Sequence, residues 1–96
     1  MVKSSKILDI NTKSGEKMKI YDFNGKKNIC GERVKEARKR LNITQNELSA
    51  RLQTEGVNIE RDSVSRIEIG TRFVADYELA VLSKVLKVDA AYLLGM

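Results

Sequence analysis

The sequence predicts an all-α protein, a compact bundle of five helices that follows a non-helical N-terminal leader. Two observations support this prediction. After Cys30, apolar residues recur at the three- and four-residue spacing of helices that bury one side. Helix-start and helix-stop signals separate these periodic segments, among them a capping box at Thr44 and a glycine at position 70.

The composition narrows the class of protein before any motif is weighed. A chain of 96 residues fits one small domain. Its single cysteine cannot form an intramolecular disulfide, and the absence of histidine removes the commonest zinc ligand and general base. Nothing near the N-terminus resembles a signal-peptide core, and no apolar run approaches the roughly 18 residues that span a bilayer. We therefore expect a cytoplasmic protein with no metal, no cofactor and no membrane contact.

The charge is unevenly distributed. The net charge is +5, of which residues 1–29 contribute +4 from seven lysines and three acidic residues, while residues 30–96 contribute only +1 from 11 basic and 10 acidic residues. Within the second part, basic residues crowd between positions 33 and 40. This local cluster, rather than the global charge, favours an acidic partner. The cluster consists of Arg33, Lys35, Arg38, Lys39 and Arg40.

Two parts of the chain are expected, a basic leader at 1–29 and a helical domain at 30–96. The leader segments 6–10 and 17–23 flank a Ser14-Gly15 turn signal and could pair as a β-hairpin, which is marginal in isolation. A mobile basic arm that follows phosphates and a solvated tail without a role are the other interpretations. We also record the hypothesis that Met18 is an alternative start.

The first two helices have clear start signals and apolar faces. The first is expected at about 31–41, with Val34, Ala37 and Leu41 on its buried side. Thr44 and Glu47 form a capping box, so the second helix begins at Gln45. Its apolar edge is Leu48 and Leu52, and Ser49 is small enough for close helix crossing.

The three remaining helices follow a break at about 53–60. Gly56 and Asn58 interrupt the periodicity there, and Val57 or Ile59 can turn inward to anchor the loop. A third helix is expected from 60 or 61 to 69, with Val64 and Ile67 buried and Gly70 as its terminator. A fourth covers 76–86, and Asp89 can cap a short fifth helix.

These motifs together resemble a known family. The sequences Arg33-Val-Lys-Glu-Ala-Arg38, Thr44-Gln-Asn-Glu-Leu48 and Val64-Ser-Arg-Ile-Glu-Ile-Gly70, with the leucine ladder after them, look like the helix-turn-helix domain of phage repressors of the Cro and CI type, the XRE family. The resemblance implies a lambda-repressor-like bundle. The break between the second and third helices is longer than the usual turn of about three to four residues, so the turn is expected to be extended.

The resemblance also implies roles for individual residues. Phosphate contacts would come from Thr44 and Gln45, because the N-terminus of a helix favours anions. Since Ile69 occupies a position that is often polar, further phosphate contacts would shift to Thr71 and Arg72. Arg38 and Glu68 match positions that form a structural ion pair between the first and third helices. The residues expected to contact base edges in the major groove are Arg61, Asp62, Ser63, Ser65 and Arg66.

The function implied is sequence-specific binding of double-stranded DNA by a small, repressor-like transcriptional regulator. Such a regulator would bind a near-palindromic operator, as a homodimer, in a bacterial or phage-type cytoplasm and on the nucleoid. Two alternatives stay open: an antitoxin or immunity regulator that also binds a partner protein, and a helix-turn-helix used only for protein interaction. An enzyme is not expected, because the sequence holds no histidine, phosphate-binding loop or motif-placed carboxylate pair.

Overall fold

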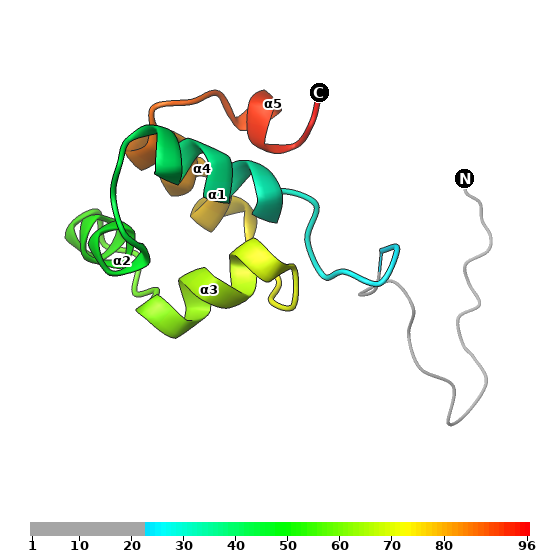
Figure 1. The fold of residues 1–96 in the computed structure, drawn as a ribbon, viewed down its shortest axis with the longest axis horizontal. Coiled ribbons are helices and arrows are strands. Elements are labelled where there is room, and N and C mark those ends of the chain that lie inside the picture. Colours follow the sequence, from blue (N-terminus) through cyan, green and yellow to red (C-terminus); the bar gives the residue numbers. More distant parts are fainter. Residues whose placement is uncertain (1–22) are drawn as a thin grey trace.

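The computed structural model describes residues 23–96, and within this range the fold consists of five α-helices, as predicted (Figure 1). The first, third and fourth helices lie within a residue of their expected bounds, and the second begins at Gln45 as expected but continues past the expected start of the break at position 53. Within this range no helix combines the length and apolarity needed to cross a membrane. The helices are α1 (Gly31–Arg40), α2 (Gln45–Thr54), α3 (Arg61–Ile69), α4 (Asp76–Leu86) and α5 (Ala90–Leu93).

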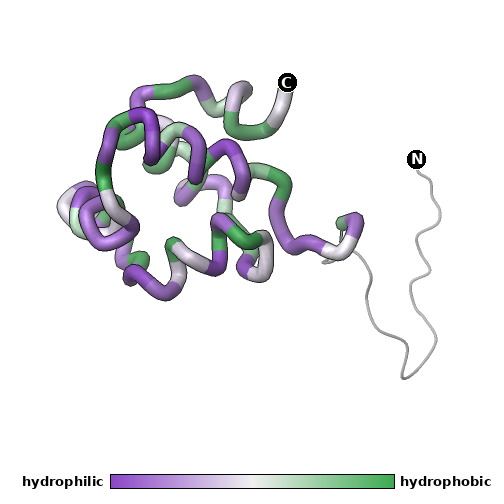
Figure 2. The backbone as a smooth tube through the Cα atoms, in the orientation of Figure 1, coloured by the Kyte–Doolittle hydropathy of each residue, from purple (hydrophilic) through white to green (hydrophobic). Residues whose placement is uncertain are grey.

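The helices enclose one hydrophobic core. α3 packs against α1 and α2, while α4 contacts α1, α2 and α5. Hydrophobic and hydrophilic residues alternate along each helix because only one side faces this core (Figure 2). The predicted inward residues of α1, α2 and α3 are all buried except Leu41, which packs at the edge of the core. The buried apolar residues are Cys30, Val34, Ala37, Ile43, Leu48, Leu52, Val57, Ile59, Val64, Ile67, Leu82, Leu86 and Leu93.

The turn between α2 and α3 is held by a glycine-terminated helix end. Gly56 adopts φ +90°, and its N–H donates to the Gln53 carbonyl at 2.9 Å while the Val57 N–H donates to Leu52 at 3.0 Å. These two bonds form a Schellman motif, which directs the chain back toward the core. Val57 and Ile59 are both buried, which confirms the predicted anchoring of the loop. The break covers 55–60 and is therefore shorter than expected, but still extended.

One predicted cap is wrong. Asp89 occupies the residue before α5, but its side chain makes no capping hydrogen bond. α5 is held instead by the burial of Leu93 and by Tyr92, whose hydroxyl donates to Glu36 at 2.9 Å and accepts from Arg40 at 2.9 Å. Tertiary contacts with α1 therefore replace the local cap.

The described chain begins with a tight turn. Asn24 and Gly25 have φ of 52° and 79°, and Phe23 and Lys26 exchange backbone hydrogen bonds of 2.6 and 2.9 Å across them. Two central residues with positive φ are typical of a type I′ turn, for which Asn-Gly is a favoured sequence. The hairpin and arm interpretations of the leader, the Ser14-Gly15 turn and Met18 lie outside the described residues.

Asn28 joins this N-terminal segment to the bundle. Its Oδ1 accepts from the backbone N–H groups of Cys30 at 3.1 Å and Gly31 at 2.8 Å, at the start of α1. Its Nδ2 donates to the carbonyls of Ile67 at 3.1 Å and Arg72 at 2.8 Å, at the end of α3. One amide side chain therefore bonds backbone groups at the start of α1 and at, or just after, the end of α3.

The close approach of α1 to the end of α3 requires a glycine at position 31. A Cβ atom there would lie 2.2 Å from the Ile67 carbonyl oxygen and 2.9 Å from that of Glu68. Both obstacles are backbone atoms, so α1 and α3 would have to separate.

We expect Gly31→Ala to lower the free energy of unfolding by about 1 to 2 kcal/mol, because overpacking of about 2 to 3 kcal/mol outweighs the roughly 1 kcal/mol that alanine gains from helix propensity. Urea denaturation measures the change. Lys35→Ala, at an exposed position of the same helix, serves as the control and should change stability by no more than about 0.5 kcal/mol. A Gly31→Ala protein more stable than the parent would contradict the close approach of α1 and α3.

Candidate nucleic-acid interface

The N-terminus of α2 is fixed by the predicted capping box. The Thr44 hydroxyl accepts from the Glu47 N–H at 3.0 Å, and the Glu47 carboxylate accepts from the Thr44 N–H at 2.7 Å. Thr44, Asn46 and Glu47 are exposed, and Gln45 is half-buried. The positive end of α2 is therefore accessible at the surface, where an anion is stabilised by the helix dipole.

A buried carboxylate connects α2 to α1 and α3. Glu68 accepts from Arg38 through Nε at 2.7 Å and Nη2 at 3.1 Å, so the ion pair that the resemblance implies is present and bidentate. The Gln45 Nε2 donates to the same carboxylate at 3.0 Å. Arg38 also donates to the Ile43 carbonyl at 2.8 Å, in the link between α1 and α2. The start of α2 is thereby held at a fixed position relative to α3.

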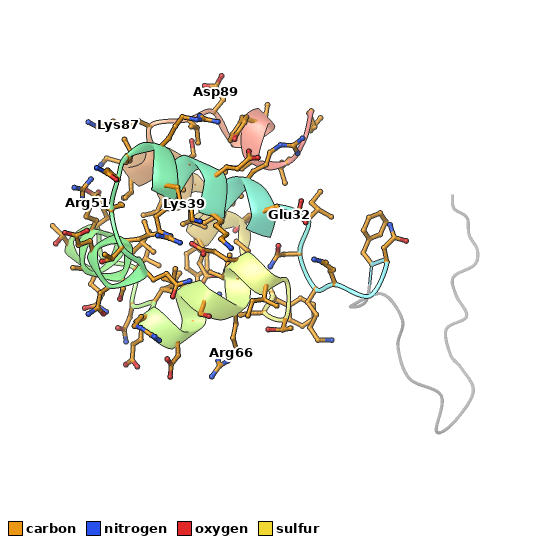
Figure 3. The ribbon with its side chains drawn as sticks, viewed as in Figure 1. Glu32, Lys39, Arg51, Arg66, Lys87 and Asp89 are labelled. Carbon is orange, nitrogen blue, oxygen red and sulfur yellow. The ribbon has the colours of Figure 1, made fainter. Side chains whose placement is uncertain are left out.

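α3 presents a polar face to solvent. Arg61, Asp62 and Arg66 are exposed, and Ser63 and Ser65 are half-buried, whereas Val64, Ile67 and Glu68 face the core. All five residues predicted to contact bases therefore lie outside the buried side of the helix. Figure 3 shows Arg66 projecting from α3 away from the other helices.

The two arginines of α3 differ in their surroundings. Arg61 donates from Nη1 to the carboxylate of Asp62 at 2.9 Å, between side chains that are 56% and 77% exposed. An ion pair this exposed contributes little stability, so a stronger partner can displace it. Among the described residues, no hydrogen bond or ion pair is found for the Arg66 guanidinium. Arg66 is thus the cation of α3 that is most available to a partner.

After α3, the structure separates the two predicted phosphate contacts. Thr71 is exposed, with its hydroxyl 3.5 Å from the Arg66 carbonyl. Arg72 is instead occupied in the fold: Nη1 and Nη2 donate to the Glu78 carboxylate at 2.9 and 3.1 Å, and Nη1 also donates to the Phe73 carbonyl at 2.8 Å. The bidentate pair gives Arg72 a structural role that the sequence did not suggest.

This pair changes the protonation of both partners. The hydrogen bonds from Arg72 hold the pKa of the Glu78 carboxyl below its usual range, against the opposing effect of burial, and the Ala75 N–H adds a further bond at 3.0 Å. The same hydrogen bonds raise the pKa of Arg72. Glu78 thus remains ionised at neutral pH and ties the loop after α3 to the start of α4.

Cys30 has no comparable chemistry. Its side chain is buried, and burial raises the pKa of the thiol. Since the thiolate is the reactive form, Cys30 is a core residue and not a nucleophile.

Sequence reasoning missed Asn28. Asparagine just before a helix is a capping signal, and Asn28 precedes the expected first helix by three residues. That signal could have predicted its bonds to Cys30 and Gly31. Its bonds to Ile67 and Arg72 cross 39 and 44 residues of sequence, and no local pattern predicts them.

The geometry defines a class of protein. A capped helix, an extended turn and a following helix with an exposed polar face, all carried by a five-helix bundle, are the features of a helix-turn-helix protein of the phage-repressor type.

Comparisons with known proteins give the same class of protein. Residues 34–93 match the helix-turn-helix family, more than half of the chain, and the protein belongs to this family. It is similar to the P22 c2 repressor protein, solved in complex with the synthetic operator 9T in the presence of Tl+, with a TM-score of 0.59 and 32% sequence identity. That match covers 69% of this chain and 92% of the repressor chain. No curated protein sequence matches the chain.

The Arg72–Glu78 pair predicts a pH-dependent contribution to stability. The pKa of Glu78 is lower in the folded state than in the unfolded state. The pair's contribution to the free energy of unfolding is therefore complete above the unfolded pKa and is lost as the pH falls through the folded pKa. Glu78→Gln should therefore lower the free energy of unfolding by about 1 to 3 kcal/mol at pH 7, and by less as the pH falls below about 4. Urea denaturation at several pH values measures both effects.

Glu55→Gln is the matched control, because Glu55 pairs with Lys84 at the surface, where the two side chains are 33% and 69% exposed. Its cost should stay below about 1 kcal/mol. If the two variants lose equal stability at pH 7, Glu78 has no special structural role.

Proposed function

We propose that the protein is a repressor-like transcriptional regulator that binds double-stranded DNA at a specific sequence, with α3 in the major groove. The observation that best supports this function is the exposed polar face of α3, which Glu68 holds beside the capped N-terminus of α2. A major groove about 12 Å wide admits an α-helix. The similarity to a repressor solved with a synthetic operator supports this reading.

In this proposal the phosphate and base contacts have separate roles. Thr44 and Gln45 position the protein on a phosphate, which binds at the α2 N-terminus and receives the second N–H of the Gln45 amide. Thr71 contacts a second phosphate. Arg72 is assigned to the scaffold because Glu78 already occupies its guanidinium.

Bases would be read from the exposed face of α3. Arg66 is the principal reader, since a free guanidinium can donate to O6 and N7 of one guanine. Arg61 reads a second base after it leaves Asp62, and Asp62 can then accept from cytosine N4. Ser63 and Ser65 supply short polar contacts between these longer side chains.

In this proposal residues 30–96 form the DNA-binding domain. The protein acts in the cytoplasm, on the nucleoid, and has no catalytic activity. Two copies bind a near-palindromic operator, with half-sites about one DNA turn apart. A module used only for protein contacts would have no need for the free arginine on α3.

Selection of binding sites from a pool of random duplexes tests the proposed function directly. We expect enrichment of one motif, present as two inverted copies spaced about 10 base pairs apart. Recovery of no motif, or of duplexes bound without sequence preference, would contradict sequence-specific regulation.

The selected duplex then tests Arg66. Arg66→Ala should lower affinity for the selected duplex by about 1 to 3 kcal/mol and remove the preference at one base pair, while binding to a scrambled duplex changes much less. Arg51→Ala removes an exposed arginine from α2, at a site that Figure 3 places away from Arg66, and provides the control of equal charge. An equal loss of affinity for selected and scrambled duplexes would show that Arg66 contacts phosphate and reads no base.

A further inference from the structure

The end of α3 is covered by the N-terminal segment 26–28. Three donor groups of this segment make four hydrogen bonds to carbonyls in the last turn of α3 or just after it, where a helix leaves carbonyl groups without a full set of intrahelical partners. The bonds are Lys26 Nζ to Ile69 O at 3.4 Å, Lys27 N to Gly70 O at 2.7 Å, and Asn28 Nδ2 to Ile67 O at 3.1 Å and Arg72 O at 2.8 Å.

These contacts add positive charge at the end of the helix. The C-terminus of a helix carries partial negative charge, which repels a phosphate. The donors of residues 26–28 occupy the carbonyls, and the two lysines add positive charge at the same place. Both lysines are exposed, and no carboxylate of residues 23–96 forms an ion pair with either of them. The Lys27 ammonium lies 5.5 Å from the centre of the Phe73 ring, a cation–π contact that keeps it next to the loop after α3.

This end of α3 would come close to a DNA strand. A helix of nine residues is about 13.5 Å long, slightly more than the width of the major groove, about 12 Å. When its exposed face reads bases, its last turn reaches a phosphate strand at the edge of the groove. Ile69, 60% exposed on that turn, has no side-chain donor, and Glu78 already holds Arg72. Lys26 lies beside Ile69 and can supply the missing cation.

We propose that Lys26 and Lys27 form a phosphate-binding clamp at the C-terminal end of α3; this rests on the proposed DNA-binding function. The clamp belongs to the chain before the first helix, outside the helix-turn-helix itself. The Asn24-Gly25 turn precedes the lysines and the Asn28 bonds follow them, so the backbone of the clamp is already ordered before DNA binds. Little conformational entropy is then lost on binding.

The dependence of DNA affinity on salt concentration measures these contacts. The slope of log affinity against log salt concentration is negative. Lys26→Gln and Lys27→Gln should each reduce its magnitude by about 0.9, and the double variant should reduce it by about 1.8. The reduction should be the same for the selected and a scrambled duplex, because phosphates carry no sequence information. Lys26→Arg, which keeps the charge, should restore the parental slope at position 26.

Lys87→Gln is the matched control. It removes the same charge from an exposed position after α4, on the side of the bundle away from Arg66 in Figure 3, and should leave the slope within about 0.2 of the parent. Thermal unfolding of each variant shows that the fold is retained. If Lys26→Gln and Lys27→Gln show the same salt dependence as Lys87→Gln, the clamp is contradicted while the proposed DNA binding stands. A parent protein that binds no duplex would overturn the proposed function and the clamp together.

Discussion

The buried carboxylate of Glu68 is the interaction on which the position of Gln45 beside α3 depends. It accepts three hydrogen bonds, two from Arg38 of α1 and one from Gln45 of α2, while belonging itself to α3. Its side chain is 3% exposed, and that of Arg38 is 10% exposed. The two helices of the proposed interface, α2 and α3, therefore meet α1 at one side chain.

A buried ion pair does not by itself favour stability. Removing two charges from water costs several kcal/mol per ion, and replacement by apolar residues is often neutral or stabilising. Here the polar cluster has a second effect, because the bond from Gln45 Nε2 fixes the side chain of an interface residue and uses only one of its two amide N–H groups. We interpret the pair as a positioning device. Hydrophobic packing by Leu48, Leu52, Val64 and Ile67 supplies apolar burial between α2 and α3.

The sequence predicted the helices well because their signals are local. The capping box at Thr44, the glycines at 56 and 70, and the spacing of Val64 and Ile67 each lie within a few residues of the structure they determine. Errors arose where a distant partner decides the outcome. Asp89 takes the predicted position before α5 but makes no side-chain capping bond, and contacts of Tyr92 and Leu93 with the bundle hold the helix.

The candidate site shows the same division. Burial on one side of α3 follows from helical periodicity, so the exposure of Arg61, Asp62 and Arg66 was predictable. The partner of Arg72 was not, since Glu78 reads equally well as a first-turn acid of α4. The lysines of the leader could not be placed either, because the bonds that hold residues 26–28 on α3 cross about 40 residues of sequence.

The central claim is that Glu68 positions Gln45 for a phosphate, and a double-mutant cycle on DNA affinity tests it most directly. Arg38→Met combined with Glu68→Leu removes the charges as a pair, leaves the net charge unchanged and keeps the core apolar. In the parent, Gln45→Ala should weaken binding to the selected duplex by about 1 kcal/mol; in the Arg38→Met, Glu68→Leu background it should have almost no further effect. An equal cost of Gln45→Ala in both backgrounds would contradict the role of Glu68 in positioning Gln45.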